Sequence, residues 1–170
     1  IHAVAPEGAV STLAGDGTAG YLDGPAAAAR FAAPAGVAVD ALGNVLVADR
    51  DNHRIRKVAP DGTVTTVAGS GTPGFADGAV AMAQFNAPSG VAVDAAGTIW
   101  VADSVNSRVR MIAGGRVSSV AGSEGYFVGA TGLAPDGAGN MWVAEQGANR
   151  IRRIARDGTV LTAGGAVVPG

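Results

Sequence analysis

Residues 31–49 read FAAPAGVAVDALGNVLVAD, and the same pattern returns 54 residues later as FNAPSGVAVDAAGTIWVAD in residues 85–103. A third copy, GLAPDGAGNMWVAE, occupies residues 132–145. The chain also opens on a partial copy, because residues 1–24 match residues 55–78 almost position by position. Self-similarity of this length is typical of repeat architectures. The chain therefore consists of repeated units and begins within one of them.

Each complete unit divides into four short apolar segments separated by turn residues; in the first unit they are residues 36–40, 44–49, 54–59 and 63–68. Gly43 and the Asp61-Gly62 pair suit the tight turns of β-hairpins. Residues 54–58 alternate polar and apolar side chains, as a half-buried strand does. Units of this kind predict an all-β fold, a β-propeller built from four-stranded antiparallel blades, in which neighbouring sheets bury each other's faces.

The repeats predict four divisions of the chain: a trailing half-blade and inter-blade passage at 1–30, blades at 31–84 and 85–130, and a blade with a C-terminal tail at 131–170. The third unit starts only 42 residues after its counterpart at Gly90, so it has lost about a dozen residues upstream. About three and a half blades are present, whereas a closed propeller takes about four to eight. We expect a ring of about six blades, completed by the remaining blades of a longer polypeptide or, in second place, by self-association.

Composition narrows the function classes. With 48% hydrophobic and 15% charged residues the chain has the composition of a folded domain. Glycine or a charged residue interrupts every apolar stretch, which excludes a membrane-spanning helix and predicts no membrane insertion. The absence of cysteine excludes disulfides and thiolate metal sites. A net charge of −2 provides no general attraction for nucleic acid.

These units resemble NHL repeats, whose pattern is P-x-G-V-A-V-D, then G-N-I-x-V-A-D, then N-x-R-I-x-K. The resemblance extends over residues 1–164 and rests on three copies in register. Residues 67–85 further resemble the multi-repeat NHL proteins of bacteria, plants and algae. The resemblance implies a propeller, usually six-bladed in related proteins. The family includes protein-binding and RNA-binding modules, and lyases and lactonases have a similar fold. The resemblance therefore implies a function of one of these kinds.

An acidic residue ends the second strand of every unit, and an arginine follows five positions later. The pairs are Asp49 with Arg54, Asp103 with Arg108, and Glu145 with Arg150. A hairpin would bring the two members of each pair together. Because the arrangement repeats in each unit, we interpret it as a structural ion pair between strands two and three and not as a catalytic group.

Positions that differ between the copies are the better candidates for binding, because a structural requirement repeats while a site need not. They lie in the connections between strands two and three and in the passages between blades, which share a face in propellers. This predicted loop face comprises Tyr21, Asp23, Arg50, Asp51, Asn52, His53, Phe75, Asp77, Asn106 and Asn149. A polar surface with a few aromatic side chains suits partner recognition. His53 alone is a weak candidate for a general base.

Other motifs favour structural roles. The G-x-G-x-x-G pattern occurs at residues 15–20 and again at 69–74, and neither copy stands between a strand and a long helix as a dinucleotide site requires. Only His2 and His53 offer imidazole ligands, at no metal-binding spacing, so no metal and no cofactor are predicted for this chain; calcium bound by carboxylates in the central channel of a completed ring stays open. The arginines of residues 149–156 suggest RNA, which ranks below a protein partner. Trp100, Trp142 and Leu46 occupy equivalent positions and are predicted to lie between sheets.

The sequence therefore predicts a non-enzymatic scaffold or binding module that presents its loop face to a protein or glycan partner. We expect it to form part of a larger extracellular or cell-surface protein. No catalytic residue is assigned. The alternative is an enzyme, in which the chain would be half of a lactonase-type or lyase-type catalytic propeller.

Overall fold

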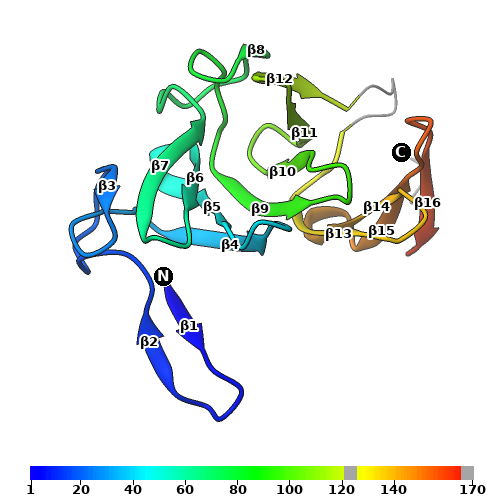
Figure 1. Ribbon diagram of the computed structural model, residues 1–170. Helices are drawn as coiled ribbons and strands as arrows, with labels where there is room; N and C mark the ends of the chain where they lie inside the picture. Colours follow the sequence, from blue (N-terminus) through cyan, green and yellow to red (C-terminus); the bar gives the residue numbers. More distant parts are fainter. Residues whose placement is uncertain (121–125, 166–170) are drawn as a thin grey trace.

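The computed structural model describes residues 1–120 and 126–165, so residues 121–125 and the end of the predicted C-terminal tail, 166–170, lie outside it. The described chain is built from β-strands that form four antiparallel sheets. A hairpin of β1 (His2–Val4) and β2 (Val10–Thr12) comes first and projects from one end of the molecule (Figure 1). The other three sheets follow one another in an arc.

The first two of these sheets have the same plan. One consists of β4 (Pro34–Val39), β5 (Val45–Asp49), β6 (Arg54–Val58) and β7 (Thr63–Ala68), with the short β3 (Gly24–Pro25) beside β7. The next consists of β9 (Pro88–Val93), β10 (Ile99–Asp103), β11 (Arg108–Ala113) and β12 (Arg116–Ser119), with β8 (Gly78–Ala79) beside β12. Short 3-10 turns at Arg50–Asn52 and Gln146–Ala148 connect the second and third strands of the first and last blades.

The third sheet has four strands, β13 (Ala130–Pro135), β14 (Met141–Glu145), β15 (Arg150–Ile154) and β16 (Val160–Gly164). The innermost strands β4, β9 and β13 lie side by side, which arranges the sheets as successive blades (Figure 1). The predicted all-β fold of four-stranded antiparallel blades is confirmed. The passages into the first two blades add an outer strand to each sheet that the sequence pattern did not predict.

The turn after each inner strand explains the predicted hairpins. Asp40 follows β4, and its Oδ1 accepts hydrogen bonds of 2.9 Å from the backbone N–H groups of Leu42 and Asn44. Gly43 adopts a φ of 79°, a left-handed conformation that costs little without a β-carbon. Asp94 and Asp136 accept the same backbone hydrogen bonds in the next two blades. Local turn chemistry therefore sets the length of these hairpins.

The hydrophobic cores lie between blades. Leu46 and Ile55 of the first blade and Val101 and Ile112 of the second form one buried cluster around Phe85, which the intervening passage supplies. Phe127 takes the same place between the second and third blades. Phe31 is buried in a third cluster with residues of the first blade. Each blade is therefore stabilised by its neighbours.

The prediction for the tryptophans is only partly correct. Leu46 is buried in the core between the first two blades, and Trp100 packs against the core between the second and third, but Trp100 and Trp142 are only half-buried. Their indole Nε1 groups donate to Oδ2 of Asp94 at 2.8 Å and of Asp136 at 3.1 Å. An indole N–H requires a hydrogen-bond acceptor when it leaves water, and here the aspartate supplies it and fixes the ring. Leucine has no polar group and needs no acceptor. The predicted strand register itself is correct, because Leu46, Trp100 and Trp142 have equivalent cross-strand partners.

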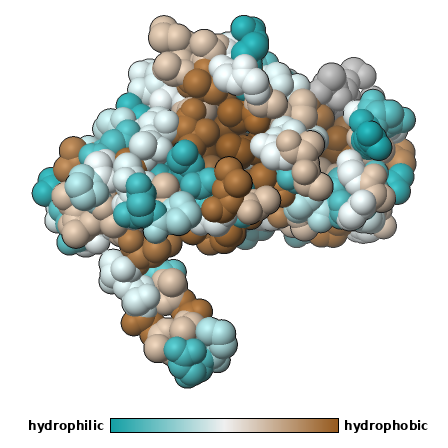
Figure 2. Space-filling view, in the orientation of Figure 1, coloured by the Kyte–Doolittle hydropathy of each residue, from teal (hydrophilic) through white to brown (hydrophobic). Residues whose placement is uncertain are grey.

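The β1–β2 hairpin exposes apolar side chains, among them Val4 and Val10 (Figure 2). Its strands pair with each other, and its base is held by the backbone N–H groups of Leu13 and Ala14, which donate to the carbonyl oxygen of Ile1.

Within residues 1–120 and 126–165 there is no helix with the length and hydrophobicity needed to cross a membrane.

Candidate functional site

A buried arginine occupies the third strand of every blade. Arg56 of β6 and Arg110 of β11 are fully buried, and Arg152 of β15 is nearly so. A guanidinium group taken out of water requires charged and hydrogen-bonding partners, because its desolvation is costly. The partners of each arginine show what the charged residues of the repeat do.

Arg56 joins two segments that are distant in sequence. Its Nη1 lies 2.7 Å from Asp49, at the end of β5, and its Nη2 lies 2.6 Å from Asp23 in the passage that precedes the blade. It also donates to the carbonyl oxygens of Leu22, at 2.8 Å, and Arg30, at 3.0 Å. These bonds attach the passage to the blade.

Arg110 repeats the arrangement one blade later. It lies 2.7 Å from Asp103 and 2.6 Å from Asp77, and donates to the carbonyl oxygens of Ala76, at 2.7 Å, and Gln84, at 3.0 Å. Burial raises the pKa of Asp103, although its hydrogen bonds oppose that rise. The carboxylates of both centres serve as acceptors for the chain's own donors, which is a structural role.

The third blade has a different centre. Glu145 replaces the aspartate and lies 2.5 Å from Arg150 and 3.9 Å from Arg152. Arg152 also donates to the carbonyl oxygen of Tyr126 at 3.1 Å. The passage into this blade is about a dozen residues shorter, and residues 121–125 of it lie outside the described structure.

The predicted ion pairs need correction in two blades. Asp49 and Asp103 lie opposite Arg54 and Arg108 at the same blade edge, as expected, but their ion pairs are with Arg56 and Arg110, two residues further along the strand. The aspartate is short and lies diagonally across the hairpin from an arginine long enough to reach it.

Glu145, one methylene longer, bonds Arg150 directly opposite, as predicted. Sequence reasoning missed Arg56, Arg110 and Arg152 as buried residues. The signal was present, because the second arginine of R-x-R recurs in every unit.

Several residues of the predicted loop face are structural. Asn52 donates to Asp49 at 2.8 Å and to the Gly20 carbonyl at 2.7 Å, and Asn106 makes the same two bonds to Asp103 and Gly74. Nδ1 of His53 accepts a hydrogen bond of 3.1 Å from the backbone of Ala87, in the next blade.

Three further members of the predicted loop face are exposed. Arg50 and Asp51 lie 3.7 Å apart on the surface. Asn149 is exposed in a left-handed conformation at the end of a 3-10 turn.

Tyr21 and Phe75 remain available at the surface, with 45% and 51% of each residue exposed. Tyr126, which sequence reasoning did not select, is 61% exposed. The guanidinium carbon of Arg54 lies 3.8 Å from the centre of the Tyr21 ring. That of Arg108 lies 5.6 Å from the Phe75 ring and 4.5 Å from the Tyr126 ring. We call Tyr21, Phe75 and Tyr126 the aromatic row.

The aromatic row runs across all three blades. Arg54, stacked on Tyr21, donates to the carbonyl oxygen of Ser70 at 2.7 Å, in the passage that carries Phe75. Arg108 lies between Phe75 and Tyr126. Cation–π contacts of this kind orient both partners and leave the outer face of each ring exposed. The arrangement offers rigid aromatic area for contact and no nucleophile or general base.

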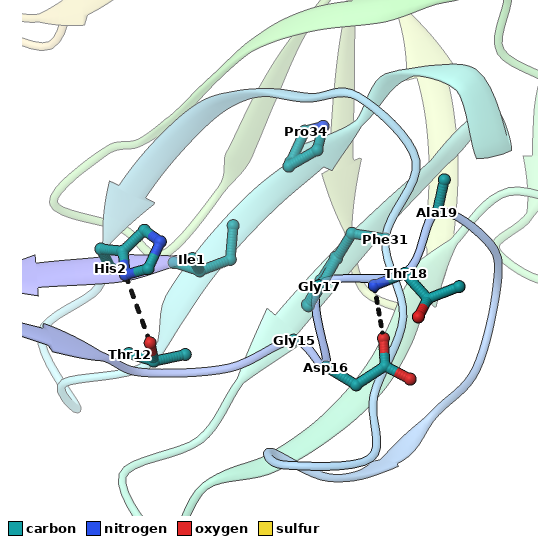
Figure 3. A pocket seen from close by; sticks show the side chains of 10 residues that line it. All are labelled: Ile1, His2, Thr12, Gly15, Asp16, Gly17, Thr18, Ala19, Phe31 and Pro34. Atoms are coloured by element: carbon teal, nitrogen blue, oxygen red, sulfur yellow. Dashed lines mark hydrogen bonds between the residues drawn. The ribbon is translucent and has the colours of Figure 1, made fainter.

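A cavity of about 430 Å³ lies at the base of the hairpin, lined by Ile1, Gly15, Asp16 and Phe31 among others (Figure 3). One junction later, Gly69 corresponds to Gly15, and the backbone of His53 and Arg54 lies against it. Elsewhere, no group of three or more acidic or histidine side chains in residues 1–120 and 126–165 is placed to hold a metal ion.

Comparison with known proteins agrees with the fold. The NHL repeat model matches residues 31–58 and 85–111. The chain is 40% identical over 94 residues to the chloroplastic protein SUPPRESSOR OF QUENCHING 1 of Arabidopsis thaliana, which covers 55% of this chain and 9% of that protein. It is 39% identical over 92 residues to human NHL repeat-containing protein 2, covering 52% of this chain and 12% of that protein. The chain thus spans about a tenth of the length of these relatives.

Solved structures show the same architecture. An auxiliary nutrient binding protein from Bacteroides thetaiotaomicron superposes with a TM-score of 0.57 at 26% identity, over 69% of this chain and 31% of that one. Virginiamycin B lyase from Staphylococcus aureus superposes with a TM-score of 0.60 at 11% identity, over 95% and 47%. A gluconolactonase from Xanthomonas campestris gives 0.58 at 16% identity, over 75% and 46%. The last two show the fold alone.

The blade architecture and the repeat matches define the class of protein, a β-propeller assembled from NHL repeats. The repeat matches at residues 31–58 and 85–111 and the similarity to NHL repeat-containing proteins support an NHL-repeat family for this chain.

Proposed function

We propose that this chain is a non-enzymatic binding module that docks a protein partner on its loop face, within a larger extracellular or cell-surface protein. The observation that carries the proposal is the aromatic row, three rings that are each about half exposed and stacked with arginine. Aromatic and arginine side chains are enriched in protein interfaces and in their energetic centres.

The rings are held in place before any partner arrives. The Tyr21 hydroxyl lies 3.1 Å from the hydroxyl of Thr66, and the ring packs against Arg54. Ordering a mobile side chain at an interface costs about 0.5–1.5 kcal/mol, so a preorganised ring loses less on binding. A protein surface is favoured over a glycan because the row extends over three blades and is flanked by guanidinium groups.

The alternative is half of a lactonase-type or lyase-type catalytic ring. It draws on the superposition of 95% of this chain on the lyase, which concerns the fold alone. Against it, the recurrent acids Asp49, Asp103 and Glu145 are buried in ion pairs with arginines of their own blades. If the alternative holds, residues that line the central channel of the completed ring carry the activity, and the aromatic row does not.

The test compares the full-length protein with a variant in which Tyr21, Phe75 and Tyr126 are all alanine. Proteins cross-linked to each on the native cell are quantified by mass spectrometry, and direct binding of each candidate is then measured with purified components. The control is Leu42→Ala, because Leu42 is exposed in the turn at the opposite end of the strands.

We expect one defined partner whose affinity falls at least about tenfold, or about 1.4 kcal/mol, in the triple variant and is unchanged in the control. Equal affinity in all three proteins would contradict the proposal, as would binding of a glycan and of no protein.

A further inference from the structure

The junction between the second and third blades lacks filling residues that the earlier junctions contain. Between the first two blades, the passage contributes Val80, Ala83 and Phe85 to the core. Its counterpart before the first blade contributes Ala26, Ala29 and Phe31. In the described part of the shorter third passage, Phe127 and the partly buried Val120 contribute to the core cluster. The aromatic residue is kept, while the small residues beside it have no counterpart there.

A cavity of about 400 Å³ opens at this junction. Trp100, Met111 and Val120 of the second blade line one side, and Ile154, Arg156 and Asp157 of the third blade line the other. Small-molecule sites are mostly apolar clefts of about 300–1,000 Å³ with a few polar groups. The cavity has this size and composition.

The apolar wall of the cavity is preorganised. Trp100 and Met111 are cross-strand partners in β10 and β11, and both are half-buried. Asp94 holds the indole N–H of Trp100 at 2.8 Å, which fixes the orientation of the ring. In the first blade the equivalent partners are Leu46 and Lys57, so the tryptophan and methionine distinguish this junction. A thioether beside an indole ring adapts readily to a planar guest.

The charges of the cavity select a cation. Two carboxylates, those of Asp94 and Asp157, and one guanidinium, that of Arg156, line the cavity, which gives its lining one net negative charge. The pKa of Asp157 is lowered, chiefly by the backbone N–H of Thr159, and that of Asp94 is also lowered, because hydrogen bonds from Trp100 and backbone N–H groups outweigh its burial. Both are therefore ionised at neutral pH. Asp157 accepts a 2.9 Å bond from the backbone N–H of Thr159 at Oδ1, and its carboxylate is exposed at the rim of the cavity.

We propose that the cavity between the second and third blades binds a small planar organic cation, its ring against Trp100 and Met111 and its charge paired with Asp157. Indole is the side chain with the strongest cation–π attraction, and a carboxylate at the rim adds a charge-assisted hydrogen bond. The site lies between strands and is separate from the aromatic row. Its occupant is distinct from the protein partner proposed above.

The test uses three probes of nearly equal shape: benzamidinium, neutral benzamide and anionic benzoate. The chain has two tryptophans, so Trp142→Phe leaves Trp100 as the single indole N–H signal in an NMR spectrum. Each probe is titrated while that signal is followed. We expect benzamidinium to bind most tightly, benzamide more weakly and benzoate most weakly.

Two substitutions locate the site. Met111→Lys introduces the residue that the first blade carries at this position, and the added cation should raise the dissociation constant for benzamidinium at least about tenfold. Asp157→Asn should remove the preference for benzamidinium over benzamide. The matched control is Asp61→Asn in the equivalent turn of the first blade, which should change neither. Unchanged spectra elsewhere in the protein show that each variant is folded.

Three results would overturn the proposal. They are a Trp100 signal that no probe moves at millimolar concentration, a preference for benzoate, and undiminished benzamidinium binding by Met111→Lys.

Discussion

Val37 and Val91 occupy the same position in the inner strands of successive blades, yet Val37 is 59% exposed and Val91 is 6% exposed. Both pair with a valine of the second strand, Val47 and Val101. The difference is the neighbour, because β9 lies between β4 and β13, while β4 has an inner strand beside it on one side only within the described chain. A residue in this fold is therefore buried by the adjacent blade and not by its own.

The opposite end of the arc shows the same effect. Ile55 and Val109 are buried in the third strands of the first two blades, whereas Ile151 at the equivalent position of the last blade is exposed. The arc thus has an apolar face at each end. Exposed apolar patches mark surfaces that associate, and we expect further blades of the same polypeptide, or in second place another copy, to cover them.

The largest effect should come from the centre of the arc. Arg110→Met leaves Asp103 buried without its cation, and breaking a buried ion pair in this way costs about 3–5 kcal/mol. Arg30→Met removes a half-exposed partner of Asp16 near the end of the arc and should cost about 1 kcal/mol or less. Urea unfolding of both variants measures the difference. Equal losses would show that burial does not set the contribution of the arginine.

A smaller difference should separate the two valines. Val91→Ala removes buried methyl groups and should lower the free energy of unfolding by about 2 kcal/mol. Val37→Ala should change it by about 0.5 kcal/mol or less in the isolated 170-residue chain.

If another copy covers the end face, Val37→Glu will lower the mass measured by light scattering for that chain. A stable, well-folded monomer of the unmodified chain would contradict the expectation that these faces are covered.

The smallest effect should be a local pH response in the last blade. Hydrogen bonds from the Asn140 side chain and backbone lower the pKa of Asp136 from 3.8 to about 2. A carboxylate with a depressed pKa in the folded state stabilises the turn fully above its ordinary pKa, and this stabilisation is lost as the pH falls from about 4 to about 2.

Because Trp142 donates to Asp136 at 3.1 Å, its fluorescence should report the titration in a Trp100→Phe background. Asp136→Asn should abolish the response near pH 2 that the protonation of this carboxyl produces. A response that persists in that variant would assign it to another group.

Much of the local structure was predictable, because it depends on neighbours in sequence. Residues 63–68, expected to be a strand, are β7 without change, and residues 36–40 are β4 displaced by a residue or two. The aspartates and glycines of the turns act within four residues of themselves. The recurrence of residues 31–49 at 85–103 was sufficient to predict a propeller, because blades of this kind must stack to bury their faces.

The sequence by itself determined the strands, their turns and the position of an arginine in every third strand. Only the tertiary structure decided which arginine is buried, because the second acid of the first two centres, Asp23 or Asp77, lies 33 residues away in another segment. It also decided that Trp100 faces a cavity where Leu46 is buried, since that depends on what the next passage contributes. Hydrogen bonds within a turn are set by local geometry, whereas burial and ion pairing across blades depend on segments that only the fold brings together.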